Sequence, residues 1–496
     1  MGRFARRLLV AVVSAVSTAV LTSSVLASPA SAADQPVVSP VVADRPVVFP
    51  AGTYHVPTYR PAPATSRLVV CKPGGNLTGL AQQLAEECAY HDIQAAVDAV
   101  RQRGTTIYVL PGTYREQPSL ATPSGPCRAL ADRTTLSYEQ QHACPHLRNL
   151  INVSGLDDLQ IEGVGAGVVV EGDKPIGIRA DRADGFYLRG VTVKGFAEDG
   201  VAVVETDGYV LDQVAALNDG EHGLAAYGTD HGVIADCEAS GNGDAGIATA
   251  SASDQRGNRL SVEIRGCRSH GNLIGYSGTA GDSVYVHDNE FSANATGAVL
   301  DSSAQAVGMP QNHAMFVANR VFSNNADPYR DCGTKCPARA VPVGTGMLLA
   351  GGDENTYASN FVYDNWRYGI AQHWIPASRR GETDPAKQRD TSHGNRYVGN
   401  LMGVTPSGGR ASNGVDFWWD EQGDGNCWQN NASSWGRPRS DPAALPDCDH
   451  PSSGGPYAQL GNPAKTSVVT ACAAYTPHSR DPKGCTWLTT PPRPAA

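Results

Sequence analysis

The sequence predicts an all-β solenoid, a parallel β-helix whose coils each span about 23 residues. Glycine followed by an aliphatic residue recurs with this period, at Gly177, Gly200, Gly223 and Gly246. Apolar and polar residues alternate within the short segments that follow, which is typical of strands with one buried face. Glycine makes up 54 of the 496 residues, and such period-two patterning broken by glycine does not sustain helices.

The N-terminal 70 residues precede the repeats. Residues 1–32 carry a basic start, an apolar stretch and the small-residue sequence Ala30-Ser31-Ala32, which predicts a secretory signal peptide and export from the cell. Its removal would take away three arginines and move the net charge from −10 to about −13, so an anionic partner such as nucleic acid is disfavoured. Residues 33–70 are rich in proline and valine and predict an extended leader.

The next segment predicts a helix over 91–100. Ile93, Ala96, Val97 and Val100 share one face, and Asp92 is placed to cap the N-terminus. A solenoid needs its open end covered, so we expect this helix to be an N-terminal cap. The expected β-helix, including this cap, spans 71–430, and a cysteine-containing tail spans 431–496.

Asparagine marks the bends of the later coils. One column holds Val191, Val214, Cys237, Cys267, Asn289, Asn319, Asn360 and Asn400, and a second holds Asn242, Asn272, Asn294, Asn324 and Asn365. Asparagine tolerates left-handed backbone conformations, and its amide can bond to an asparagine one turn above. The columns therefore predict ladders of side-chain hydrogen bonds along the stack.

The cysteines predict disulfides, because twelve is an even number and the chain is expected to be exported. We expect Cys127 and Cys144 to staple one loop and Cys332 and Cys336 another. Cys237 and Cys267 share a column, which allows either a disulfide across coils or a stack of inward thiols. The last four, Cys427, Cys448, Cys472 and Cys485, predict a disulfide-tied tail folded against the last coil.

The segment IQAAVDAV followed by TIYVLPGTYRE resembles the opening of secreted right-handed parallel β-helix proteins of the pectin lyase-like superfamily. The resemblance covers roughly residues 90–430 and implies a right-handed coil. That superfamily includes lyases, hydrolases, esterases, epimerases and proteins without known catalysis, so the resemblance specifies fold rather than activity. The chain lacks the Gly-His-Gly and Arg-Ile-Lys signatures of polygalacturonases and the GDFIFG-type segment of pectin methylesterases, so no catalytic residue is carried over.

Insertions between coils predict the place of a cleft, because long loops make its walls. They fall between Asn325 and Gly346, at about 375–393 and before Gly414, so we expect the cleft over the coils of 297–421. If the residue after each glycine points inward, the outward positions there include Asp301, His373, Asp416 and Trp418. Neighbouring coils lie ~4.8 Å apart, which would stack His373 beside Trp418 and bring Asp301 near Asp353.

The first functional interpretation is hydrolysis of an extracellular polysaccharide by paired carboxylates. Carboxyl groups ~5–5.5 Å apart lead to retention at the anomeric carbon and ~6.5–9.5 Å apart to inversion. The candidate catalytic residues are Asp301, Asp353, His373, Asp416 and Asp420, with Glu354 and Glu421 beside them. Candidate aromatic residues for stacking on sugars are Trp366, Trp374, Trp418 and Trp419.

The second interpretation is a polysaccharide lyase, which must neutralise a uronate with Ca²⁺ or arginine and remove a proton with a base. His373 or Tyr227 is the candidate base, and Arg367, Arg379 and Arg380 are the candidate partners of the carboxylate. The third is a glycan- or wall-binding rod without catalysis. In each case we expect a polysaccharide partner, a monomer and no membrane span. We expect no metal site of transition-metal spacing and no cofactor, apart from Ca²⁺ in a lyase.

Overall fold

A computed structural model describes residues 43–49, 52–58, 64–74, 77–250, 258–280, 283–302, 310–333, 335–375, 383, 392–434, 436–454, 461–479 and 481–495. The chain divides into Met1–Ser39 and one compact unit, Pro40–Ala496, and all the described residues lie in the second. The expected signal peptide lies outside the described residues. No helix among the described residues is long and apolar enough to cross a membrane.

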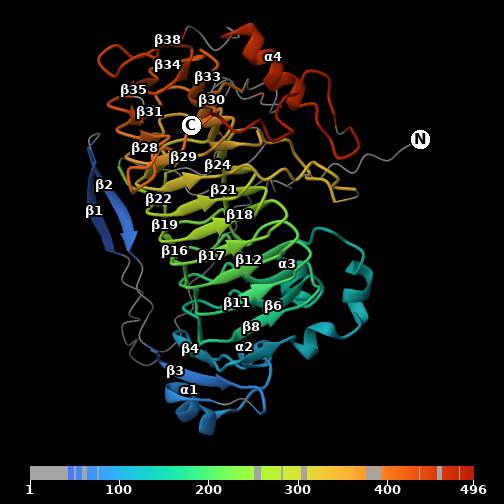
Figure 1. Cartoon of the computed structure of the whole chain (residues 1–496). Helices are drawn as coiled ribbons and strands as arrows, with labels where there is room; N and C mark the ends of the chain where they lie inside the picture. Colours follow the sequence, from blue (N-terminus) through green and yellow to red (C-terminus); the bar gives the residue numbers. More distant parts are fainter. Residues whose placement is uncertain are drawn as a thin grey trace, which may run out of the picture. The chain divides into compact units, whose positions relative to one another are not determined.

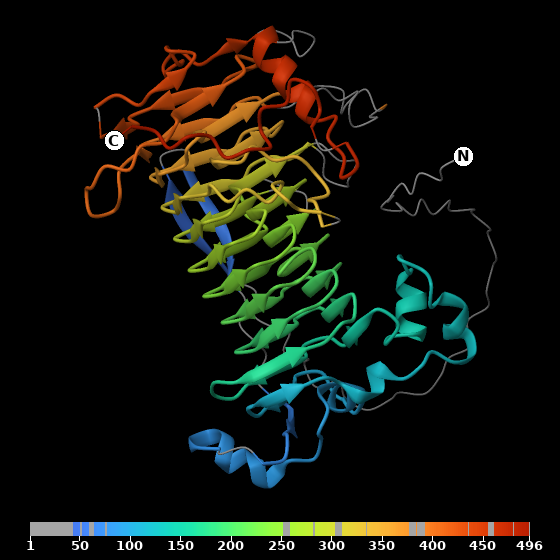
Figure 2. The same ribbon diagram turned by 45° about the vertical axis from the view of Figure 1, so that its right-hand side comes forward.

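The described residues form three long parallel sheets, to which successive coils contribute one strand each (Figures 1 and 2). Sheet I contains β3 (Ser66–Val70), β4 (Thr105–Val109), β7 (Gln160–Gly163), β10 (Tyr187–Arg189), β13 (Val210–Asp212), β16 (Gly232–Ala235), β19 (Val262–Arg265), β22 (Val284–His287), β25 (Met315–Val317), β28 (Thr356–Ala358), β31 (Arg396–Val398) and β35 (Cys427–Gln429). Sheet II contains β5 (Gly112–Tyr114), β8 (Val168–Glu171), β11 (Thr192–Lys194), β14 (Ala215–Leu217), β17 (Glu238–Ser240), β20 (Arg268–His270), β23 (Glu290–Ser292), β26 (Arg320–Phe322), β29 (Phe361–Tyr363), β32 (Leu401–Met402) and β36 (Ala432–Ser433). Sheet III contains β6 (Asn149–Ser154), β9 (Ile176–Asp181), β12 (Asp199–Val204), β15 (Leu224–Tyr227), β18 (Ala245–Ala250), β21 (Ile274–Thr279), β24 (Thr296–Asp301), β27 (Thr345–Ala350), β30 (Tyr368–His373), β33 (Val415–Trp419) and β37 (Ser440–Asp441).

The glycine-led segments of the sequence are the strands of sheet III. Val201 of β12 pairs with Ile178 below it and Leu224 above it, each 23 residues away. The residues directly after the glycines point inward and form a continuous core with the inward side chains of the other two sheets. Each fully buried aliphatic side chain there contributes about 1.5–3 kcal/mol relative to an exposed one. The predicted parallel β-helix is confirmed.

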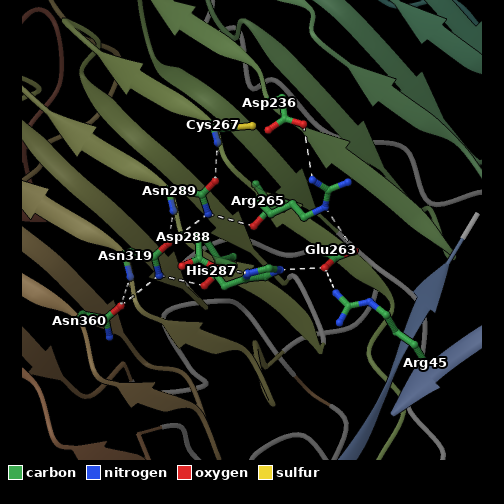
Figure 3. Close-up of polar contacts among 12 residues, drawn as sticks. Arg45, Asp236, Glu263, Arg265, Cys267, His287, Asp288, Asn289, Asn319 and Asn360 are labelled. Carbon is green, nitrogen blue, oxygen red and sulfur yellow. Dashed lines mark hydrogen bonds and ion pairs between the residues drawn. The ribbon is translucent and has the colours of Figure 1, made fainter. Parts of the chain in front are cut away.

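Both asparagine columns form the predicted ladders. In the column between sheets I and II, Asn289 Nδ2 donates to Asn319 Oδ1 at 3.0 Å, and Asn319 Nδ2 donates to Asn360 Oδ1 at 3.1 Å (Figure 3). The left-handed residue of each bend is the one before the asparagine, for example Asp288 with φ 54° and Ala318 with φ 56°. The asparagine itself is outside the left-handed region. Its backbone N–H and its side-chain Nδ2 both donate to the Oδ1 of the asparagine in the next coil.

The predicted N-terminal cap is α2 (Ile93–Asp98), which follows α1 (Gly79–Leu84) and the 3₁₀ turn η1 (Ala85–Glu87). Ile93 and Val97 are buried in the core beneath the first coils. Asp92 is the N-cap residue, yet its side chain makes no capping hydrogen bond. The buried carboxylate of Glu116 accepts hydrogen bonds from the N–H groups of Ile93 and Gln94 instead, at 3.0 and 2.8 Å.

Part of the expected leader is folded. β1 (Ala43–Phe49) and β2 (Gly52–Thr58) form an antiparallel hairpin, and β3 already belongs to sheet I. The sequence had predicted only an extended leader over residues 33–70. The hairpin lies beside sheet I because Phe49 packs edge-on against Tyr285, with ring centroids 5.4 Å apart. Arg45 of the hairpin forms an ion pair with Glu263 of β19 (Figure 3).

The insertion 115–149 contains η2 (Gln117–Leu120), η3 (Gly125–Leu130) and α3 (Tyr138–Ala143) and is stapled by Cys127–Cys144 as predicted. The tail contains β38 (Ser453–Gly454), which pairs with β34 (Gly423–Asp424), and α4 (Pro463–Cys472). The disulfides Cys427–Cys448 and Cys472–Cys485 tie the tail, and Cys332–Cys336 closes its loop. Cys237–Cys267 is a disulfide across neighbouring coils, and Cys71–Cys88 joins β3 to the cap.

Candidate active site

A column of ionisable side chains lies where the chain enters the strands of sheet III. Glu198, Glu221 and Asp244 stand at equivalent positions on three successive coils, 23 residues apart, and backbone hydrogen bonds of 2.7 Å join each to the next. Asp199 and His222 occupy the following position on the first two of these coils. The strict period and the parallel register therefore stack acidic groups and an imidazole on the outer face of the coil.

Asp199, Glu221 and His222 form the centre of this column. One carboxylate oxygen from each acid and one ring nitrogen of His222 all lie within 4.8 Å of one another. Glu221 and His222 are half-buried, and Asp199 is 7% exposed at the start of β12. Two carboxyl groups at this separation can serve as the proton donor and nucleophile of a glycoside hydrolase that retains configuration.

His222 lies between two carboxylates. Its Nδ1 contacts Asp199 Oδ1 at 2.9 Å, and its Nε2 contacts Asp244 Oδ2 at 3.7 Å. Burial alone would lower the pKa of His222, but the hydrogen bonds and charges of Asp199 and Asp244 outweigh burial and raise that pKa to about 10. The ring is therefore an imidazolium at neutral pH, and both of its nitrogens donate.

Tyr227, the last residue of β15, completes this group. Its hydroxyl oxygen is 3.0 Å from His222 Nδ1. Burial, followed by the nearby charges of Asp199, Glu221 and Asp244, raises the pKa of Tyr227 well above its usual value, so the phenol keeps its proton. Because the imidazolium Nδ1 is a donor with a single hydrogen, that hydrogen is shared between Asp199 Oδ1 and the phenol oxygen, and the phenol does not donate to the ring.

Two arginines extend the group along the sheet. Arg179 of β9 forms an ion pair with Asp181 at 2.6 Å. Arg339, from the insertion between β26 and β27, contacts Asp244 at 3.1 Å and Asp301 at 3.5 Å. A continuous chain of charged contacts thus runs from His222 through Asp244 and Arg339 to Asp301. We call Asp199, Glu221, His222, Tyr227 and Asp244 the acid–histidine cluster.

The same donors define which metal the cluster would suit. Two carboxylates and an imidazole are ligands for transition metals, whereas Ca²⁺ takes oxygen ligands only. Nδ1 of His222 is held by Asp199 and Tyr227, so a metal would have to displace the proton that the surrounding carboxylates stabilise on the ring. The residues therefore fit a protonated histidine better than a metal ligand.

Four of the site residues predicted from sequence line one cavity of about 500 Å³ over the later strands of sheet III: Asp301, His373, Trp374 and Asp420. Asp301 accepts a hydrogen bond from Thr279 at 2.8 Å. Asp420 accepts from the backbone N–H groups of Trp374 and Gln422 at 2.8 and 3.0 Å, and burial raises its pKa to about 6.

Asp416 lies elsewhere because the last coil is shifted by two residues from the predicted register. Phe417 pairs with Ile370 and Trp418 with Ala371, so Asp416 takes the place of Gly369 and His373 is not stacked on Trp418. The reason is Asn413, which continues the asparagine column from Asn365 and delays the start of the strand. Asp416 is buried, and accepts from Asn413 Nδ2 and the Arg439 N–H, both at 2.9 Å.

The other predicted residues are spread over the C-terminal coils. Asp353 is not among the residues that line the cavity; its carboxylate accepts from the His393 N–H at 2.9 Å. Arg367 donates to the Thr489 carbonyl of the tail at 2.6 Å, and Trp366 donates to Asp364. Trp418 stacks on Tyr368, and Trp419 packs against Trp428. Arg379 and Arg380 lie outside the described residues.

Except for Tyr227, the acid–histidine cluster was not predicted from the sequence. The outward positions considered there follow each glycine, whereas Glu221 and His222 precede Gly223. The signal that identifies them is the 23-residue repetition of an acidic residue before the glycine, at Glu198, Glu221 and Asp244.

The comparisons with known proteins agree with the fold. The family model described as the right handed beta helix region matches residues 176–374. The A-module of the mannuronan C-5 epimerase AlgE4 from Azotobacter vinelandii is similar in structure, with 14% identity, a TM-score of 0.41 and coverage of 69% of this chain and 90% of that one. A rhamnogalacturonan lyase has 14% identity, a TM-score of 0.46 and coverage of 70% and 84%.

DFA-IIIase from Arthrobacter chlorophenolicus A6 in complex with GF2 has 12% identity, a TM-score of 0.42 and coverage of 76% of this chain and 93% of that one. At these identities the likeness concerns the fold alone. No curated protein matches the sequence. The predicted right-handed parallel β-helix is thus confirmed as a fold.

Proposed function

We propose that this right-handed parallel β-helix belongs to the pectin lyase-like superfamily and is an exported glycoside hydrolase that cleaves an extracellular polysaccharide at its acid–histidine cluster. The observation that carries the proposal is the grouping of Asp199, Glu221 and His222, with ligand atoms within 4.8 Å of one another on a partly exposed face. Six disulfides support export, because such bonds persist in oxidising compartments.

The two carboxylates divide the chemistry. Asp199 accepts a charged hydrogen bond from His222 that orients its carboxylate for attack on the anomeric carbon. Glu221 donates a proton to the leaving oxygen, and then takes a proton from the water that hydrolyses the glycosyl–enzyme bond. The phenol hydrogen of Tyr227 is directed to a substrate oxygen and contributes to positioning. The short separation of the carboxylates predicts retention of configuration.

The test is turnover of a panel of polysaccharides by the variant Glu221→Gln, which keeps shape and removes the acid–base group. We expect a loss of about 10²- to 10⁴-fold in kcat, because this is the usual contribution of general acid–base catalysis. Glu198→Gln is the matched control, since Glu198 holds the same position one coil earlier and pairs with Arg148. Its kcat should stay near that of the native protein.

Nuclear magnetic resonance of the first-formed product should show a retained anomeric configuration. An inverted product, or a Glu221→Gln variant as active as Glu198→Gln, would contradict the proposal. If the native protein binds glycans and turns none over, the molecule is a binding rod.

A second candidate, elimination from a uronate-containing polysaccharide, is favoured by Arg179 and Arg339, which lie beside the cluster and offer cations for a substrate carboxylate. In that reaction Tyr227 would take part in proton transfer to the leaving oxygen. Elimination leaves an unsaturated uronate that absorbs ultraviolet light, whereas hydrolysis leaves none. We expect new reducing ends without that absorbance, and its appearance would establish elimination instead.

A further inference from the structure

The cavity that contains Asp301, His373, Trp374 and Asp420 is lined by none of the residues of the acid–histidine cluster, which it adjoins through Arg339. Its floor is the outward face of β24, β27 and β30, and its walls are the segment 338–341 and α4 with the tail residue Trp487. Its volume of about 500 Å³ lies within the range of small-molecule sites. The tail and the insertion close over this part of the sheet, and both belong to the same compact unit.

The lining has two kinds of surface. Aliphatic side chains and the rings of Trp374 and Trp487 form the larger part. Asp301, Arg339, His373 and Asp420 gather polar groups within the same lining. This combination suits a molecule that has both an apolar face and hydroxyl groups.

Asp420 is oriented before any ligand arrives. The backbone N–H of Trp374 donates to its Oδ2 and that of Gln422 to its Oδ1, so these two hydrogen bonds fix the carboxylate of this lining residue in one orientation. Each carboxylate oxygen accepts more than one hydrogen bond, which leaves capacity for a ligand hydroxyl. A ligand hydroxyl would give this buried carboxylate a further hydrogen bond, which a purely apolar ligand cannot do.

The cavity also lies in line with the proposed cleavage point. Sheet III orders its strands β15, β18, β21, β24, β27 and β30, which is five steps from the coil of His222 to that of His373. At ~4.8 Å a step the coil of His222 lies about 14 Å along the sheet from the near edge of the cavity, at Asp301 of β24, and about 24 Å from its far edge, at His373, a range that a few linked sugars span. Arg339 touches both regions, because it pairs with Asp244 and also lines the cavity.

From this arrangement we infer that the cavity is a carbohydrate-binding site that receives the end of the glycan chain, one or two sugar units long. The C–H face of a sugar ring packs on the tryptophans, and its hydroxyls bond to Asp420, Asp301 and Arg339. The inference that the cavity binds sugar is supported by its lining residues and does not require the proposed cleavage. Its role as the chain-end site rests on the proposed function, because that role requires cleavage at the acid–histidine cluster.

The test fills the mouth of the cavity from α4. Thr470 is an exposed residue of α4 that lines the cavity, and Ser467 is an exposed residue of the same helix that does not. Thr470→Phe should block entry with little effect on folding, and Ser467→Phe is the matched control. Binding of glucose, galactose, mannose, fructose, galacturonic acid and their β-linked or α-linked disaccharides is measured by calorimetry and by the fluorescence of the native tryptophans.

At least one of these sugars should bind to the native protein and to Ser467→Phe, with at least 10-fold weaker binding to Thr470→Phe. Trp487→Leu should weaken the binding of the same sugar. Its Tm should fall by no more than the loss of packing of one aromatic ring explains. The inference is overturned if no sugar of the panel binds to the native protein, or if Thr470→Phe binds the sugar with the same affinity as the native protein.

The same measurements on Glu221→Gln separate this inference from the proposed function. If the native protein binds sugar but shows no turnover, the inference about the cavity holds and only the proposal of cleavage is contradicted. Where turnover is found, Thr470→Phe should change the lengths of the products, because the chain end is no longer held at a fixed distance from Glu221. Unchanged product lengths would refute the chain-end role.

Discussion

The second asparagine column begins with an aspartate. Asp219 precedes Asn242 and Asn272 in this ladder and accepts a hydrogen bond from the Phe196 N–H at 2.9 Å, while Asn242 Oδ1 accepts from the Asp219 N–H. Its Oδ2 is buried without a hydrogen-bond partner among the residues that the structure describes. Burial raises the pKa of Asp219 to about 8, so the folded protein binds a proton there that the unfolded chain releases near pH 4.

This proton predicts a pH-dependent stability. Since the pKa of the folded state exceeds that of the unfolded state, the contribution of Asp219 is complete at acid pH and is lost as the pH rises from about 4 to about 8. Asp219→Asn should remove the loss and stabilise the protein at pH 8 by about 1–3 kcal/mol. Denaturant unfolding at several pH values measures this effect.

Asn242→Asp is the control, because it places a second ionisable group in the same ladder. It should make stability fall more steeply with rising pH. Parallel pH profiles for Asp219→Asn and the native protein would contradict the assignment of a proton to Asp219.

At the scale of elements, the hairpin of β1 and β2 is attached to sheet I by few contacts. The backbone of His55 bonds to Asn258 and Leu260, Arg45 pairs with Glu263, and Phe49 lies in a small apolar cluster separate from the main core. The carboxylate of Glu263 also contacts His287 at 2.8 Å (Figure 3). Burial would raise the pKa of Glu263, but His287 and Arg45 outweigh burial and lower it.

Phe49→Ala should therefore release the hairpin without unfolding the coils. The lost ring burial costs about 3 kcal/mol, which is large for an element held by one small apolar cluster and small for the whole stack. We expect faster proteolysis within residues 43–58 and an unchanged main melting transition. Val48→Ala, at a neighbouring position that is 79% exposed, should have neither effect, and equal proteolysis of both variants would disprove the role of Phe49.

For the whole molecule, stability is distributed along the stack. Each coil contacts the coils before and after it, so a lost contact is felt by its neighbours first. Asn319 accepts from Asn289 and donates to Val286 and Asn360, all within the buried ladder. Its removal leaves several buried polar groups without partners.

Asn319→Ala should destabilise the protein by about 3–5 kcal/mol and raise hydrogen exchange in the flanking coils, while the N-terminal cap keeps its protection. Asn431→Ala is the comparison, because Asn431 ends the same column and is only half-buried, so water can replace its bonds. Uniform loss of protection along the chain would show that the stack unfolds as one unit.

The repeating parts of the molecule could be predicted from the order of its residues. The fixed 23-residue period predicted the first glycine-led strands of sheet III and the core positions after each glycine, because equal spacing brings equivalent residues into contact in a parallel stack. The ladders were predicted by the recurrence of asparagine at the bends, although the steps between these asparagines vary in length. The sequence also indicated the helical cap and the stapled loops. These features depend on neighbours one coil away, whose identity the period reveals.

The location of the candidate sites, by contrast, depends on how distant segments fold against one another. The insertion with Arg339 and the tail with α4 have no period, so the sequence could not tell that they fold over sheet III and enclose Asp301, His373 and Asp420. The register of the last coil depended on Asn413, which follows an irregular step of 48 residues from Asn365. The contact of His222 with Asp244 requires side chains from different coils to converge, and the direction of a side chain in three dimensions settles this rather than its spacing.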